Sequence, residues 1–194
     1  MLGKRIGAYL EVQEDIELKE IHLICDAFIQ LHQTMDINIA KNIIMPIWQR
    51  ISKYDQWYLN DIRLINTILF LFPVNTAIEF TRNVLDRLSK YTDFRDANIL
   101  KFALLINLSL LLIKNKDYSK SLSIIEESLQ HQRKMNYPIL ALHFSRIAIC
   151  HFHLGNKDPA VFLEKAKQLL FLYNDVEYWE RIQTEFIHYT QLKL

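Results

Sequence analysis

The chain of 194 residues carries 23 basic and 22 acidic side chains, and this balance excludes a strong electrostatic footprint for nucleic acid or an anionic membrane. With 51% hydrophobic residues, it can bury a substantial core as one large domain or a short repeat array. Only three glycines occur, which excludes glycine-rich phosphate loops and hairpin-rich sheets and predicts an all-α fold.

Helical periodicity begins near the N-terminus, where apolar side chains recur at steps of three and four residues. We expect a first helix over about 16–34 and a second over about 37–53. Asp36 is a plausible N-cap for the second helix, and Pro46 is expected to kink or split it. A third helix over 57–72 is stopped by Pro73, and further helices are predicted at about 74–91, 95–115, 118–134, 138–154, 159–173 and 176–192.

The later turns each carry a local signal. Asp117 can cap the helix that follows it, while Pro138 and Pro159 suit a first helical turn. Gly155 suits the left-handed end of a helix. About nine helices joined by short turns imply antiparallel helical hairpins. The sequence therefore divides into a tail or linker over 1–15 and a single domain over 16–194.

The hairpins form a weak repeat when the chain is aligned on a small residue in three second helices. These anchors are Ala77, Ser121 and Ala160, and twelve residues before them lie Ile65, Ser109 and Ala148. The pattern is that of a tetratricopeptide-like (TPR-like) array with a lengthened repeat. Fourteen residues before the anchors lie Arg63, Asn107 and Arg146, a position that we expect on the concave face.

The most apolar segment, 99–113, is shorter than the roughly 20 residues that span a bilayer, so we expect a buried helix and no membrane contact. Cys25 and Cys150 lie in apolar helical patterns, which indicates reduced thiols in a cytoplasmic protein. The cluster from Cys150 to His153 lacks metal-ligand spacing, a glycine elbow and an oxyanion loop. We therefore expect no metal, no cofactor and no enzyme activity.

Three segments carry a resemblance to a known family: "PIWQRISKYDQWYLNDIRLINTILFLFP", "ILKFALLINLSLLLIKNKDYSKSL" and "FSRIAICHFHLGNK". From about Ile43 to His188 the chain resembles the C-terminal domain of the Rgg/GadR/MutR transcriptional regulators, in the group that includes PlcR and PrgX. The resemblance implies a cytoplasmic receptor that binds a short linear peptide pheromone on its concave face, as in quorum sensing, and that forms a homodimer. It also implies a helix-turn-helix DNA-binding domain.

The first fifteen residues are too few for that helix-turn-helix, which needs about 60 residues. We therefore expect DNA contact only through a domain not present in this chain. Either the chain is the receptor half of a longer protein, or it is a family member without a DNA reader. The alternative function is a helical-repeat scaffold that binds a segment of a partner protein.

The predicted peptide groove uses amides and guanidinium groups for the peptide main chain and carboxylate, and apolar side chains for its pockets. The polar residues are Arg63, Asn66, Asn107 and Arg146, and the apolar residues are Ala103, Leu110, Leu142 and Ile149. Alternatively, Arg63 pairs with a helix neighbour and Asn107 makes a structural bond between helices. The C-terminal aromatic and apolar residues either cap the array or, as we favour, form a homodimer surface: Tyr178, Trp179, Ile182, Phe186 and Tyr189.

Overall fold

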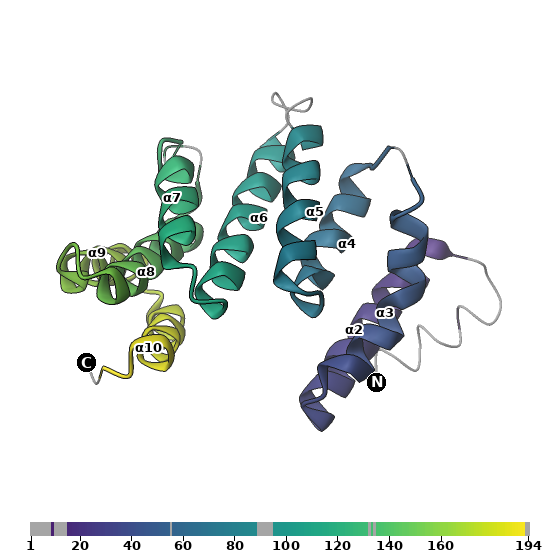
Figure 1. Cartoon of the computed structure of the whole chain (residues 1–194), viewed down its shortest axis with the longest axis horizontal. Coiled ribbons are helices and arrows are strands. Elements are labelled where there is room, and N and C mark those ends of the chain that lie inside the picture. Colours follow the sequence, from purple (N-terminus) through teal and green to yellow (C-terminus); the bar gives the residue numbers. More distant parts are fainter. Residues whose placement is uncertain are drawn as a thin grey trace. The chain divides into compact units, whose positions relative to one another are not determined.

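The computed structural model describes residues 15–54, 56–88, 95–131 and 135–192, together with Tyr9 and Arg133. The predicted all-α class is confirmed, because these residues form nine α-helices and a 3-10 turn and contain no strand (Figure 1). They fall into two compact units that divide after Pro73. The division lies inside the domain predicted over 16–194, which stays a prediction, and most of the predicted tail lies outside the described residues.

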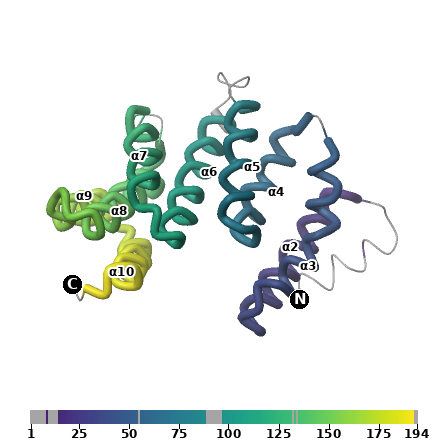
Figure 2. Tube along the Cα trace, viewed as in Figure 1, coloured from purple at the N-terminus to yellow at the C-terminus, as the bar shows by residue number. Residues whose placement is uncertain are grey.

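The first unit contains α2 (Ile16–Thr34), α3 (Ile37–Ile51), α4 (Leu59–Ile68) and the 3-10 turn η1 (Leu69–Leu71). α2 and α3 pack side by side along their length (Figure 2). The predicted cap is confirmed, because the Asp36 carboxylate accepts a hydrogen bond from the backbone N–H of Asn38 at 2.8 Å. Pro46 lies inside α3, which continues to Ile51, so the helix is not split there, and the alternative of a kink stays a prediction.

The second unit contains six helices in chain order: α5 (Val74–Leu88), α6 (Arg95–Lys114), α7 (Tyr118–Leu129), α8 (Tyr137–Leu154), α9 (Pro159–Leu172) and α10 (Val176–Thr190). Each packs against its neighbour in sequence, and α8 also contacts α6 and α10. The predicted turns are confirmed: Asp117 caps α7, Gly155 ends α8 at φ 66°, and Pro159 opens α9. The end at 91 that was predicted for the helix over 74–91 lies outside the described residues.

α6 is the central helix of the second unit and contacts α5, α7 and α8. α6 has 20 residues and is longer than the apolar segment 99–113 from which it was predicted. By length and composition, its segment Ala97–Lys114 is able to cross a membrane. However, 56% of that window is buried inside the chain. A core helix of a globular unit passes the same test, and α6 has the packing of such a helix.

The contact between α6 and α7 depends on two small residues. Ser121 and Ser109 are both fully buried, and the Ser121 hydroxyl donates to the Ser109 carbonyl at 3.0 Å. The two small side chains therefore allow α6 and α7 to approach closely. A larger side chain at either position has no space, because interiors pack at near-crystalline density.

The third repeat is shifted from the predicted alignment. Ala160, its predicted anchor, is exposed, whereas Leu163 and Ala166 in α9 repeat the burial of Ile125 and Ser128 in α7, 38 residues earlier. The alignment on Ala160 is thus one residue out. In the corrected register Asn107 corresponds to Ser145 of α8, which is fully buried, and not to Arg146.

Candidate functional site

Arg146 of α8 is a buried arginine that joins three helices of the second unit. Its side chain is 4% exposed, and its Nε and Nη2 donate to the two carboxylate oxygens of Glu185 in α10, at 2.8 and 3.3 Å. Nη1 donates to the Ile106 carbonyl and, at 3.4 Å, to the Ser109 hydroxyl, both in α6. One guanidinium group therefore holds α6, α8 and α10 together.

The two partners of this ion pair differ in their access to solvent. The side chain of Glu185 is 23% exposed, against 4% for Arg146. A guanidinium taken out of water costs several kcal/mol unless a charge and hydrogen bonds compensate it. The carboxylate of Glu185 supplies that charge from the solvent side. We expected Arg146 on the concave face, but its side chain lies just beneath the surface.

An open groove of about 660 Å³ lies between α6 and α10, and Glu185 of the ion pair is part of its lining. It is lined by Leu110, Lys114, Glu177, Glu180, Arg181, Thr184, Glu185, His188 and Tyr189. The lining carries charges of both signs, and Glu177 is paired with Arg181 one turn along α10 at 2.5 Å. Burial raises the pKa of the Tyr189 phenol, with a contribution from Glu185, so this hydroxyl stays a neutral donor.

The predicted peptide-binding residues of the second unit occupy different depths. Leu110 lines the groove, while Asn107 and Ala103 on α6 and Leu142 on α8 are half-buried. Ile149 is fully buried in the core of the unit and offers no surface to a ligand. The groove therefore joins Leu110 with Glu185, a residue that the sequence did not indicate. No motif or spacing in the sequence of α10 singled out Glu185.

Arg63 and Asn66 belong to α4 of the first unit, so the structure describes them separately from Asn107 and Arg146. Arg63 is exposed and donates to the Asn60 side chain at 2.9 Å, three residues earlier on the same helix. It lines a largely apolar pocket of about 420 Å³ with residues of α2 and α4: Ile21, Ile24, Cys25, Leu64 and Thr67. Asn66 is half-buried.

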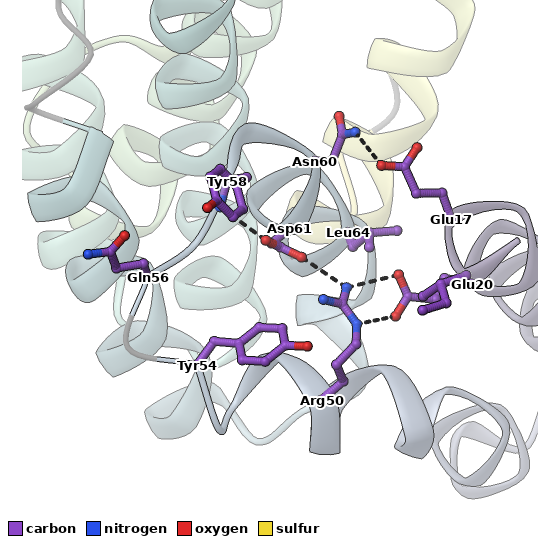
Figure 3. A pocket seen from close by; sticks show the side chains of 10 residues that line it. Glu17, Glu20, Arg50, Tyr54, Gln56, Tyr58, Asn60, Asp61 and Leu64 are labelled. Atoms are coloured by element: carbon purple, nitrogen blue, oxygen red, sulfur yellow. Dashed lines mark hydrogen bonds and ion pairs between the residues drawn. The ribbon is translucent and has the colours of Figure 1, made fainter.

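The first unit also holds a charge cluster that sequence reasoning missed (Figure 3). Arg50 of α3 donates to both carboxylate oxygens of Glu20 in α2, at 2.5 and 2.9 Å, and to Asp61 in α4 at 2.9 Å. Asp61 also accepts from the backbone N–H of Tyr58 at 3.0 Å and so caps α4. Burial by itself lowers the pKa of Arg50, but the bonds to both acids outweigh it and the net shift is upward.

Figure 3 shows the cluster in a pocket of about 700 Å³ that Tyr54 and Tyr58 also line. The side chains of Glu20 and Asp61 are only 8% and 9% exposed. Because both acids already pair with Arg50, the arrangement serves to hold α2, α3 and α4 together. A signal existed in the sequence, since Glu20 shares the buried face of α2 with Ile24 and Ala27.

Three of the five residues predicted for a homodimer surface are buried within one chain. Trp179, Ile182 and Phe186 belong to the core of the second unit, and Tyr178 and Tyr189 pack against it. This burial corresponds to the alternative of internal capping, and dimerisation stays a prediction. Exposed apolar side chains do occur nearby, at the turn between α9 and α10: Phe171, Leu172, Tyr173 and Val176.

The cysteine and histidine cluster of α8 is packed structure. Burial raises the pKa of the Cys150 thiol to about 11, so it is a thiol and not a reactive thiolate at neutral pH. His153 contacts the Tyr189 carbonyl through Nε2 at 2.9 Å. Within the described ranges, no three histidine, cysteine or acidic side chains come together in a way that could hold a metal ion.

These features define an all-α helical array with interhelical ion pairs and an open groove of mixed polarity. A family model described as the C-terminal domain of the HTH-type transcriptional regulator Rgg matches residues 7–160. The chain therefore belongs to the Rgg family of transcriptional regulators, which is not a family of enzymes. No curated protein and no solved structure matches it.

The family match confirms the resemblance and changes its limits. It begins well before Ile43, where the resemblance was expected to start, and it ends at Ala160 instead of His188. The matched segment includes α6 and α8, and hence Leu110 and Arg146. α10, which provides Glu185 and most of the groove lining, lies beyond it.

Proposed function

We propose that this chain is the peptide-sensing regulatory domain of an Rgg-type transcription regulator, and that the groove between α6 and α10 binds a short linear peptide in the cytoplasm. The observation that carries the proposal is that Glu185, the ion-pair partner of Arg146, lines this groove. A ligand in the groove contacts α10 directly and acts on α6 and α8 through one guanidinium group.

The lining of the groove suits a peptide better than a compact metabolite. Leu110 and Tyr189 supply apolar surface for side chains, while Thr184 and His188 supply polar groups for an extended main chain. Lys114 complements negative charge on the ligand. An elongated, chemically mixed surface of this kind matches the alternation of polar main chain and apolar side chains in a peptide.

Regulation follows from the interhelical contacts. A peptide that binds one arrangement of α6, α8 and α10 more tightly than another shifts the population toward that arrangement. We propose that a homodimer carries this shift to a helix-turn-helix module. The exposed apolar side chains at the α9–α10 turn support such a surface, because contiguous exposed apolar residues mark interaction sites.

Affinity selection tests the peptide proposal. The chain is exposed to a pool of short synthetic peptides, and the retained peptides are titrated by calorimetry. Leu110→Glu should weaken binding more than about tenfold, because it places a charge against an apolar part of the ligand. Leu172→Glu is the matched control, since Leu172 is 77% exposed and is not part of the groove lining. Failure to retain any peptide, together with affinity for a folded partner protein, would favour the scaffold alternative.

A further inference from the structure

The two residues of the Arg146–Glu185 pair differ: Arg146 is held in place by α6, whereas Glu185 is accessible from the groove. Nη1 of Arg146 is held by the Ile106 carbonyl and the Ser109 hydroxyl, so the guanidinium is anchored on α6. Its other edge, Nε and Nη2, faces the carboxylate of Glu185. Glu185 in turn lines the groove and is nearly six times as exposed as Arg146, at 23% against 4%.

The edge that Glu185 occupies has the geometry of a carboxylate-binding site. Two parallel N–H donors of one guanidinium group match two carboxylate oxygens, and this pairing is among the strongest in proteins. Glu185 covers these two donors, so a ligand carboxylate in the groove reaches them only when the Glu185 side chain moves away. The charge of Arg146 remains compensated if one carboxylate replaces the other.

We propose that Arg146 binds the C-terminal carboxylate of the groove's ligand and that Glu185 occupies this site in the free protein as an internal competitor. This inference rests on the proposed function, and it adds the class of ligand and the means of regulation. A ligand with a free carboxylate displaces Glu185, which releases α10 from Arg146 while α6 and α8 stay joined. An amidated ligand leaves the contact between α8 and α10 in place.

Chemical rescue tests the proposal without knowledge of the peptide. Glu185→Ala leaves the Arg146 guanidinium without its carboxylate partner, so the melting temperature should fall. Sodium acetate should then raise the melting temperature of this variant more than sodium chloride does at equal ionic strength. Glu180→Ala is the matched control, because Glu180 lines the same groove on the same helix. The double variant Arg146→Met with Glu185→Ala removes the site and should show no acetate effect.

Direct binding provides a second measurement, in case the alanine variant does not fold. N-acetyl-leucine and N-acetyl-leucinamide differ only in the charged carboxylate, and both can be titrated by NMR into the wild-type chain and Glu185→Gln. Loss of the competitor should strengthen binding of the acid at least about tenfold, because the site is no longer occupied in most molecules. Binding of the amide should be the same in both proteins.

The results separate this inference from the proposed function. If acetate gives no specific rescue and the acid gains nothing in Glu185→Gln, Glu185 is a structural partner only and the inference is wrong. Peptides retained equally well with free and amidated C-termini would then leave the proposed function intact. A chain that shows acetate rescue but retains no peptide would instead contradict the proposed function while the carboxylate site stands.

Discussion

Removal of the Asp61 carboxylate is the sharpest test of the charge cluster in the first unit. In Asp61→Ala, α4 loses its capping bond to the backbone N–H of Tyr58, and Arg50 loses one of its two acidic partners. We expect α4 to detach locally from α2 and α3, since Asp61 is the residue of α4 that the Arg50 guanidinium binds.

The magnitude follows from those two losses. A missing N-cap costs about 1 kcal/mol. Removal of one partner from a buried ion pair costs about 3–5 kcal/mol when nothing replaces it. Here Glu20 still compensates Arg50, whose side chain is 25% exposed, so roughly 1–2 kcal/mol of that cost remains. The sum is about 2–3 kcal/mol.

Hydrogen–deuterium exchange measures this loss at the helix concerned. The protected amides of α4 should exchange about 30- to 150-fold faster in Asp61→Ala than in the wild type. Asp26→Ala is the control, because its side chain is 46% exposed and pairs with His22 on the surface of α2. A surface pair of this kind contributes well under 1 kcal/mol. If α4 exchanges no faster in Asp61→Ala than in Asp26→Ala, the cluster does not hold the helix and the reasoning is refuted.

Two further predictions concern the second unit. Burial lowers the pKa of His143 to about 4, below its unfolded value near 6.5. The free energy of unfolding should therefore be constant above pH 6.5 and should fall as the pH drops toward 4. In His143→Asn this loss should be smaller, as measured by urea titrations at several pH values. A flat profile between pH 6.5 and 4.5 would contradict this. Ser121→Val loses the hydrogen bond to the Ser109 carbonyl and crowds α6, so it should lower the free energy of unfolding in urea by about 2 kcal/mol. Ser123 is exposed, so Ser123→Val should leave the free energy of unfolding almost unchanged. Equal costs for the two variants would show that the α6–α7 contact is loose.

Local signals in the sequence were enough to predict the helices and most of their ends. Asp36, Asp117 and Gly155 act within three or four residues of the chain, so their effect does not depend on the tertiary fold. The continuity of α3 through Pro46 has a physical reason as well. A proline removes one helical hydrogen bond, but the packing of α3 against α2 keeps the helix continuous.

The candidate site was harder to predict, because its contacts join residues far apart in the chain. Arg146 meets Glu185 39 residues later, and Arg50 meets Glu20 30 residues earlier. Neither distance follows from a helical period. The repeat alignment placed Arg146 in register with Asn107 on the concave face, but the alignment is one residue out in the last hairpin, and the Arg146 side chain is buried.

The central position of α6 has a consequence during synthesis of the chain. α5 precedes α6, but its other partners, α7 and α8, follow it and are complete only at Leu154. At about 5–20 residues per second, translation from Lys114 to Leu154 takes roughly 2–8 s. For that time the nascent chain presents an apolar helix long enough to be mistaken for a membrane segment. The short turn at Asp117 makes α7 the nearest of these partners along the chain, and the Ser109–Ser121 contact joins it to α6.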